Sequence, residues 1–241
     1  MDFMQIDKLG SVAVMTWNYG PQNQFDTPFM HAIVEKLDEL EKDDSVKGVV
    51  ITAAQEKYFS TGLNIEYMIG QSQKGIEHAR AFLEAVSALL IKTVGFAKPL
   101  VMALNGHAVA AGCIFAAAGD YRLMREDKGF VRLPEVEINI PFWPGMTALF
   151  KDMMPPQYSR DMFLTGSRFT PEQAKNMGYV DETVPMDKLV SRAVELAEQL
   201  GRNTGPTYTI IKRDLRDNVL RIMRETDPPT IEQFLKNMMK Q

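Results

Sequence analysis

Apolar and polar residues alternate near the start of the chain, as they do in a half-buried strand. This alternation runs over residues 3–17 on either side of Gly10 and predicts a hairpin with its turn at residues 8–11. Two later segments, 48–52 and 100–104, are continuously apolar. Such runs are typical of strands buried on both faces of a parallel sheet. The chain is therefore expected to open with a sheet whose centre is covered on both sides.

Helical spacing of apolar residues separates and follows these strands. Thr27 is a predicted N-cap followed by proline, and apolar residues recur at helical spacing as far as Leu40. A second helix is predicted over about 74–94. Strands that alternate with helices in this way indicate an α/β fold with crossover connections.

The last third of the chain is predicted to be helical. Residues 170–173 (TPEQ) match a capping box, and a helix over 186–200 is expected to end at Gly201. The tail after residue 201 is modestly basic, which is usual for a solvated face or a subunit contact. No repeat or Ser/Gly linker divides the chain, so one main domain is expected.

Composition excludes several classes of protein. The 241 residues are 45% hydrophobic and 24% charged, which is typical of a globular chain and not of a disordered one. A net charge of −4 argues against nucleic acid as the main partner. One cysteine and three histidines show no metal-ligand spacing, so neither a metal site nor a disulfide is expected.

The sequence also predicts a location. An acidic residue, Asp2, stands where a signal peptide needs positive charge, so we expect a cytoplasmic protein. Residues 99–119 carry no charge, but Asn105, Gly106 and His107 interrupt the apolar run. This pattern favours a buried strand followed by a buried helix, and no membrane span is expected.

Two turns rich in small residues follow the buried strands. The first is residues 59–64 (FSTGLN), and the second is residues 105–113 (NGHAVAAGC). In the second turn a helix is predicted to begin among residues with almost no side chain, which lets its free N–H groups approach a ligand oxygen. Donors from both turns that converge on one oxygen would form an oxyanion hole. For either turn taken alone, close helix packing is the simpler explanation.

The order of these motifs resembles the crotonase family, also called the enoyl-CoA hydratase/isomerase superfamily. Residues 59–64 and 105–113 resemble its first and second oxyanion motifs. Residues 133–136 (LPEV) resemble the segment that carries a catalytic glutamate in many members. The resemblance covers most of the chain, and several ordered motifs are more specific than one.

The resemblance implies a fold and a substrate. It implies a spiral of ββα repeats over residues 1–190 that holds an acyl-CoA pocket. It implies a C-terminal helical region over residues 191–241 for oligomer contacts, as a homotrimer or a dimer of trimers. The substrate would be a coenzyme A thioester, and no separate cofactor is needed.

The resemblance also assigns roles to residues. The backbone N–H groups of Leu63 and Ala111 would hold the thioester oxygen, and Glu135 would act as the acid and base. The family usually has alanine and glycine at the two donor positions, and a backbone donor tolerates the change. Asn64 replaces a common aspartate. The other substrate-binding residues that the resemblance implies are Ser60, Gly62, Gly112, Ile114, Phe142 and Trp143.

Ile114 bears on the choice of reaction. Hydratases of this family carry a second glutamate there, because two carboxylates must hold and activate one water, and isoleucine can neither donate nor accept a proton. One carboxylate suffices to move a proton between two carbons. Together with residues 141–143 (PFW), this pattern resembles the Δ3,Δ2-enoyl-CoA isomerase branch. Glu137 is a rival base, because it would share a face with Glu135 if residues 135–139 were extended.

Other interpretations stay open. The same scaffold carries out hydration, thioester hydrolysis and carbon–carbon bond chemistry on acyl-CoA. A non-catalytic acyl-CoA-binding subunit would also keep the pocket, although it has no need of Glu135. His107 is expected to be a satisfied structural donor and Cys113 an inert packing residue. Lys57 and Lys212 are candidate contacts for the phosphates of coenzyme A.

Overall fold

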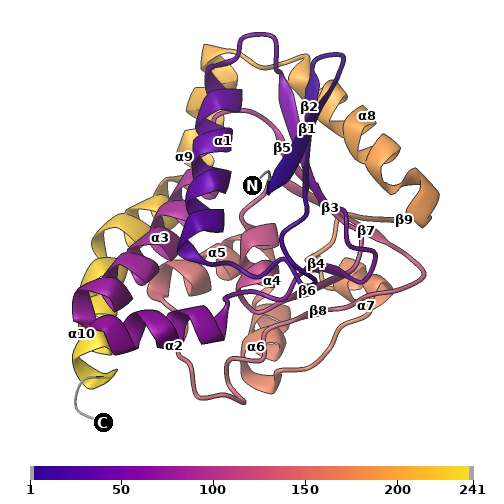
Figure 1. The fold of residues 1–241 in the computed structure, drawn as a ribbon. Helices are drawn as coiled ribbons and strands as arrows, with labels where there is room; N and C mark the ends of the chain where they lie inside the picture. The colour runs from indigo at the N-terminus through magenta and orange to yellow at the C-terminus, as the bar shows by residue number, and fades with distance from the viewer. Residues whose placement is uncertain (1–2, 239–241) are drawn as a thin grey trace.

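The computed structural model describes residues 3–238, and these residues form two sheets (Figure 1). The larger sheet has 6 strands in the order β1-β2-β3-β5-β7-β9, and the smaller has 3 in the order β4-β6-β8. The strands are β1 (Met4–Leu9), β2 (Val12–Trp17), β3 (Gly48–Ala53), β4 (Tyr58–Ser60), β5 (Leu100–Leu104), β6 (His107–Val109), β7 (Tyr121–Arg125), β8 (Val131–Arg132) and β9 (Glu182–Val184).

Helices connect and cover these strands. They are α1 (Thr27–Lys42), α2 (Ile65–Lys74), α3 (Ile76–Val94), α4 (Ala111–Ala117), α5 (Pro144–Met153), α6 (Pro156–Thr165), α7 (Pro171–Asn176), α8 (Leu189–Gly201), α9 (Pro206–Glu225) and α10 (Asp227–Met238). A short 3-10 helix, Met186–Lys188, precedes α8.

The chain winds as a spiral. After the antiparallel β1–β2 hairpin, the strand pairs of both sheets are parallel. Each turn of the spiral places one strand in the large sheet and the next in the small sheet, as β3 and β4, β5 and β6, and β7 and β8 do. Parallel neighbours need long crossovers, and the helices supply them. The predicted α/β spiral of ββα repeats is confirmed.

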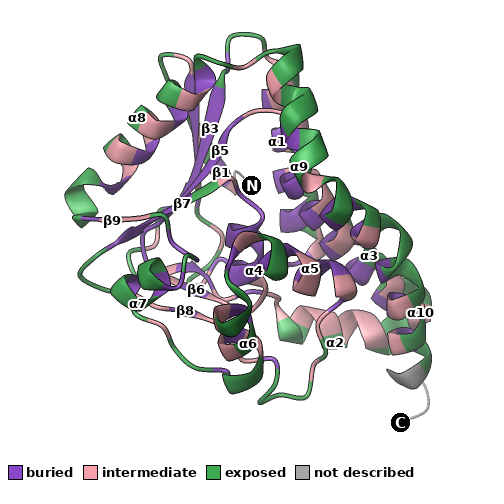
Figure 2. Cartoon of the chain, turned by 180° about the vertical axis from the view of Figure 1, so that it is seen from behind, coloured by how far each residue is buried: buried purple, intermediate pink, exposed green. Residues whose placement is uncertain are grey.

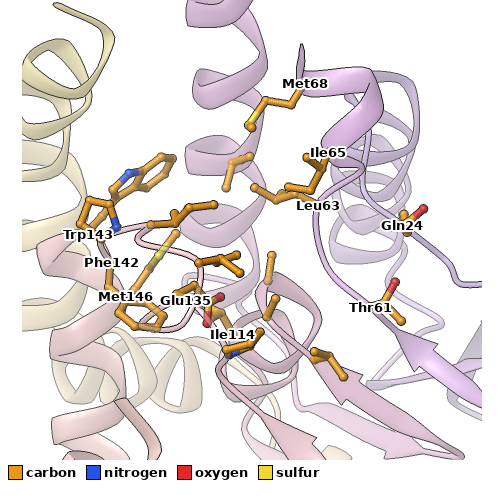
Figure 3. Close-up of a pocket in the computed structure, with 18 of the residues that line it drawn as sticks. Gln24, Thr61, Leu63, Ile65, Met68, Ile114, Glu135, Phe142, Trp143 and Met146 are labelled. Carbon is orange, nitrogen blue, oxygen red and sulfur yellow. The ribbon is translucent and has the colours of Figure 1, made fainter. Parts of the chain in front are cut away.

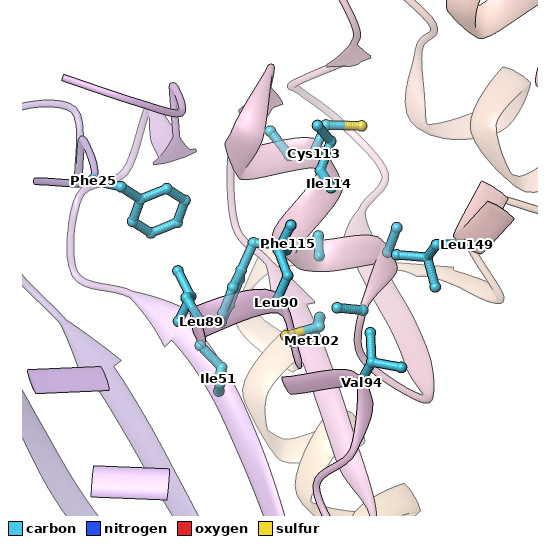
Figure 4. Packing of buried hydrophobic residues seen from close by; sticks show 14 of the residues in the cluster. Phe25, Ile51, Leu89, Leu90, Val94, Met102, Cys113, Ile114, Phe115 and Leu149 are labelled. Atoms are coloured by element: carbon cyan, nitrogen blue, oxygen red, sulfur yellow. The ribbon is translucent and has the colours of Figure 1, made fainter. Parts of the chain in front are cut away.

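The large sheet is covered on both faces, as the continuously apolar strands predicted. Every residue of β3 and β5 is buried. One face is covered by α8 (Figures 1 and 2). Ala193 and Ala197 of that helix pack in one cluster with Val50 and Val101. The other face lies under α1, α3 and α4 and holds the larger part of the core (Figure 4).

An aromatic cluster on this second face connects the segments that build the site. The ring of Trp17 on β2 lies with its centroid 4.9 Å from that of Phe59, 5.3 Å from that of Phe115 and 5.8 Å from that of Phe25. Phe59 begins the first small-residue turn, and Phe115 lies on α4 after the second. Burial of large rings stabilises a fold strongly, so the cluster fixes both turns to the same sheet.

Local signals were confirmed with two corrections. The helix predicted over 186–200 begins at Leu189, after a 3-10 turn, and Gly201 is its last residue, with Arg202 as the C-cap. The hairpin, the capping box at residues 170–173 and the strands β3 and β5 lie where the sequence predicted them. Thr27 is not the N-cap of α1, however. Asp26 takes that position, and its carboxylate accepts the N–H of Phe29 at 2.9 Å. Aspartate is as good a cap as threonine, and here its backbone has the extended conformation that a cap needs.

The C-terminal helices fold back onto the rest of the chain. Helices α9 and α10 pack against α3 and α5. Lys212 on α9 is buried, and its Nζ donates to Asp120 Oδ2 at 2.6 Å and to the carbonyl of Lys98 at 2.8 Å. These bonds anchor α9 to the sheet, so the structure does not support Lys212 as a phosphate contact. None of the helices within residues 3–238 is long and apolar enough to cross a membrane.

Two expectations about organisation stay predictions. The boundary expected at residue 190 falls inside α8, whose apolar side belongs to the core of the large sheet. The oligomer implied by the resemblance also stays a prediction, because it concerns contacts between copies of the chain. Ile210, Ile211 and Leu215 on α9 are exposed apolar side chains within the region expected to make those contacts.

Candidate active site

A cavity of about 310 Å³ opens where the two small-residue turns meet the surrounding helices (Figure 3). Its walls come from the turns before α2 and α4, from α2, α3 and α5, and from α10. Among the described residues that line it, Glu135 is the only one with an ionisable side chain. A mostly apolar pocket with few polar groups is the usual form of a small-molecule site.

The first turn presents the N–H of Leu63 to this cavity. Phe25 forms a parallel bridge with Leu63, in which the Phe25 N–H donates to Gly62 O at 2.8 Å and the Asn64 N–H to Phe25 O at 2.9 Å. Such a bridge uses the residues on either side of Leu63, so the Leu63 N–H points the other way. Leu63 lines the cavity, and its N–H is therefore available to a ligand there.

Gly62 allows the two turns to touch. Its φ of +90° is a conformation that favours glycine. A Cβ at this position would lie 2.8 Å from the Ala111 nitrogen and 3.0 Å from the Ala110 Cβ. Any larger residue would push the turns apart.

The second turn presents the N–H of Ala111. Ala111 is the first residue of α4, so its N–H has no acceptor within the helix. Ala110 before it has a φ of +52°, which is rare for a residue with a Cβ. Its own N–H donates to Arg132 O at 2.9 Å. Strain held in place by surrounding contacts is common at functional sites.

Ser60 and Gly112 lie behind these donors and are not among the residues that line the cavity. Ser60 Oγ donates to Asn23 O at 2.8 Å and accepts the N–H of Gly62 at 3.1 Å. A Cβ at Gly112 would lie 2.5 Å from Ser60 O. Both residues therefore hold the turns together. Their predicted contact with substrate, like that of Gly62, stays a prediction.

Glu135 is buried beside the donors. The residue is only 7% exposed, and its Oε2 has no hydrogen-bond partner among the described residues. Burial raises the pKa of Glu135 to about 7, and the positive charge of Arg132 opposes that rise. A carboxyl group with such a pKa can both accept and return a proton near neutral pH.

Glu137 lies apart from Glu135. Residues 135–139 form a turn in which the N–H groups of Ile138 and Ile140 donate to Glu135 O at 3.2 and 3.1 Å. The extended conformation that would align the two carboxylates is therefore absent from this segment. Glu137 pairs with Arg132 and does not line the cavity.

The predicted apolar residues meet in the cavity wall. Ile114, Phe142 and Trp143 line it, together with the donors and Glu135. Figure 3 shows Phe142, Trp143 and Met146 on one side of Glu135, and Leu63, Ile65 and Met68 on another.

Other lining residues gave no sequence signal. Gln22 and Gln24 come from the irregular segment between β2 and α1, and Gln22 Oε1 accepts a hydrogen bond from Thr61 Oγ1 at 3.0 Å. Phe234 reaches the cavity from α10, nearly at the end of the described chain. Only the long-range packing of the fold brings these residues to the site.

Three residues singled out from the sequence have other roles. Asn64 is the N-cap of α2, with its Oδ1 accepting the N–H of Tyr67 at 2.9 Å. Cys113 is fully buried, and burial raises the pKa of its thiol to about 12, as expected for an inert packing residue. His107 is not fully satisfied, because its buried Nδ1 has no partner within residues 3–238. In the same range, no group of His, Cys, Asp and Glu residues could hold a metal ion.

Comparison with known proteins identifies the family of this chain. A family model described as enoyl-CoA hydratase/isomerase matches residues 7–238. The chain belongs to that family, and the resemblance to its isomerase branch is confirmed by relatives named as enoyl-CoA delta isomerases.

Of three similar proteins, two are named as isomerases and one as a hydratase. Enoyl-CoA delta isomerase 3 of Arabidopsis thaliana is 25% identical over 90% of this chain and 94% of its own length. A putative enoyl-CoA hydratase of Thermus thermophilus is 29% identical over 88% of this chain and 82% of its own. The crystal structure of human mitochondrial delta3-delta2-enoyl-CoA isomerase has a TM-score of 0.91 at 24% identity, over 98% of this chain and 91% of that one. At 24% identity, this last comparison shows a shared fold.

Proposed function

We propose that this protein is a Δ3,Δ2-enoyl-CoA isomerase. The observation that carries the proposal is that Glu135 alone among the described cavity-lining residues is ionisable. Ile114, which by resemblance stands where hydratases of the family carry a second glutamate, lines the same cavity. Proton movement between two carbons of a bound thioester needs one group that alternates between base and acid. Relatives named as enoyl-CoA delta isomerases support the same activity.

The reaction proceeds in two proton transfers. The Glu135 carboxylate removes a proton from C2 of a 3-enoyl thioester, and the electron pair of the broken C–H bond forms a dienolate delocalised between the thioester oxygen and C4. The resulting carboxylic acid returns the proton to C4. The double bond then lies between C2 and C3, and the product has the same atoms as the substrate.

The thioester oxygen carries the developing negative charge. The N–H groups of Leu63 and Ala111 donate to it, and each donor of this kind is worth about 3–4 kcal/mol of transition-state stabilisation in comparable sites. Because the donors are backbone groups on packed turns, they are already oriented before substrate binds. The apolar wall around Glu135 excludes water, which would otherwise protonate the dienolate.

The alternatives have less support. Hydration needs a second carboxylate near the reacting carbons, and no other carboxylate lines the cavity within the described chain. Thioester hydrolysis needs an ordered water, and the wall beside Glu135 is apolar. A pure binding subunit would gain nothing from a carboxylate whose burial is costly. We therefore also propose that an acyl-CoA is the ligand and that no separate cofactor takes part.

The pH dependence of turnover tests the role of Glu135. The base must be ionised in the free enzyme, so kcat/KM for 3-hexenoyl-CoA is expected to rise with pH through about 7 and to level off above it. The appearance of the conjugated thioester, followed by absorbance between about pH 4 and 9, measures this limb. A limb near 4.5, the ordinary pKa of glutamate, would show that the buried carboxyl is not the base.

The size of the cavity suggests the class of acyl group. At about 310 Å³ the cavity lies at the lower end of the range for small-molecule sites, about 300–1,000 Å³. This size favours a short or medium acyl chain. Phe234 lines it from α10, which packs on α3 and α5 and lies apart from α4 in Figure 1.

Shortening Phe234 is therefore expected to change the preferred chain length. In Phe234→Ala, the ratio of kcat/KM for a ten-carbon over a six-carbon 3-enoyl-CoA should rise by about tenfold, the usual scale of selectivity in an apolar pocket. Phe130→Ala is the matched control, because Phe130 does not line the cavity. An unchanged ratio in Phe234→Ala would place the end of the acyl chain elsewhere.

A further inference from the structure

The turn that carries the second donor and the turn that carries Glu135 are joined at one residue. Arg132 on β8 accepts the N–H of Ala110 on its carbonyl oxygen at 2.9 Å. Ala110 directly precedes Ala111 and has the strained φ of +52°. The backbone of Arg132 therefore fixes the residue that orients the Ala111 donor.

The side chain of Arg132 extends toward the other turn. Its Nη2 donates to both carboxylate oxygens of Glu137, at 2.6 and 2.7 Å, and its Nε donates to Gly166 O at 2.6 Å. Glu137 is two residues after Glu135 in the same turn. Gly166 has a φ of +61°, a conformation that favours glycine, and a Cβ there would lie 2.7 Å from Glu137 Oε1, so the Glu137 carboxylate packs directly on this glycine.

We propose that Arg132 is a positioning residue that holds the Glu135 turn in register with the oxyanion turn, with Glu137 as its side-chain partner. The effect of Arg132 on turnover rests on the proposed isomerase function. Its effect on the order of the turn rests on the contacts alone.

Stability does not explain this ion pair. The side chain of Glu137 is 48% exposed and that of Arg132 is 21% exposed, and pairs of this kind contribute little to folding. A guanidinium fork that makes several directed hydrogen bonds, however, fixes geometry in a way that a single ammonium cannot. Because a misplacement of about 1 Å can cost about 10²-fold in rate, geometry is the more consequential property here.

Variants can separate the hydrogen bonds that Arg132 makes from the effect of its positive charge on Glu135. Arg132 on β8 is the charged group that acts on Glu135, and its positive charge lowers the pKa of that carboxyl. On α4, burial raises the pKa of the Cys113 thiol to about 12, and the Glu135 charge acts in the same direction. Arg132→Lys keeps the positive charge but loses the fork. Arg132→Met loses both, and Glu137→Ala removes the partner while leaving the positive charge in place.

Two measurements on the full chain test the proposal. Hydrogen exchange of the peptide covering residues 133–140 reports whether the N–H groups of Ile138 and Ile140 stay bonded to Glu135 O. The pH profile of 3-hexenoyl-CoA turnover reports the charge next to Glu135. Arg160→Met is the matched control, because Arg160 forms an exposed pair with its neighbour Asp161.

All three variants are expected to lose exchange protection in this peptide and to lose about 10- to 100-fold in kcat, while the control keeps both. Only Arg132→Met should move the acidic limb to higher pH, because it alone removes the positive charge that lowers the pKa of Glu135. Unchanged exchange in all three variants would overturn the proposal, whatever their activity. Isomerase activity missing from the wild type would overturn the proposed function, and the exchange data would still decide the role of Arg132.

Discussion

Replacement of Glu135 by glutamine is expected to abolish the double-bond shift while leaving the binding of substrate largely intact. The amide has the size of the carboxyl group but cannot take a proton from C2. General acid–base groups contribute about 10²–10⁴-fold to rate, so kcat should fall by that factor. The Kd for 3-hexenoyl-CoA should change little, because the donors at Leu63 and Ala111 remain.

The same variant is expected to be more stable than the wild type at alkaline pH. The pKa of Glu135 is about 7 in the folded chain, against 4.5 for an ordinary glutamate such as one in the unfolded chain. The folded form therefore keeps a proton that the unfolded form has released, and the free energy of unfolding falls as pH rises from 4.5 through 7. The loss above pH 7 is about 3 kcal/mol as an upper value, and Glu135→Gln removes it. Thermal unfolding at pH 8 measures the difference.

Glu172→Gln is the matched control for both effects, because Glu172 is an exposed carboxylate in the first turn of α7. It should keep both kcat and the melting temperature. If Glu135→Gln retained kcat, the assignment of the base would be wrong. If it lost binding and turnover together, Glu135 would be a binding group.

Proline at position 111 is expected to remove one oxyanion donor without unfolding the chain. Ala111 is the first residue of α4, where proline is well tolerated because its N–H has no helical partner. Ala110 has a ψ of −130°, outside the helical region that a following proline disfavours. Loss of one donor typically costs about 10²–10³-fold in kcat, and that fall is the expected result for Ala111→Pro.

Ala111→Gly separates the donor from the side chain. It removes the methyl group and keeps the N–H, so its kcat should stay far above that of the proline variant. Circular dichroism and melting temperature show whether Ala111→Pro is folded. A folded Ala111→Pro that turns over as fast as Ala111→Gly would contradict the oxyanion assignment.

Residues close together in sequence were the ones that sequence reasoning predicted well. The buried strands β3 and β5 follow from their continuous apolar runs, and the small residues at 62 and 110–112 follow from the need for backbone groups to approach closely. Both signals are local, because burial on two faces and the lack of a side chain are visible in a few consecutive residues.

Contacts between distant segments could not be predicted in this way. The pairing of Arg132 with Glu137 depends on the turn at residues 135–139, and the sequence alone did not distinguish that turn from an extended segment. The contact of Phe234 with the cavity depends on how α10 packs on α3 and α5. The apolar spacing of a helix shows that one side is buried but does not show which cavity that side reaches.

The location of the protein in the cell stays a prediction. Relatives named as enoyl-CoA delta isomerases are mitochondrial in Rattus norvegicus and peroxisomal in Arabidopsis thaliana by name.

The most direct test of the central claim is a comparison of two substrates with the purified protein. Incubation with 3-hexenoyl-CoA is expected to give a conjugated thioester of unchanged mass, and incubation with 2-hexenoyl-CoA is expected to give no product heavier by one water. A gain of one water from 2-hexenoyl-CoA, with no conjugated product from 3-hexenoyl-CoA, would contradict the isomerase assignment and show that a second acid completes the site.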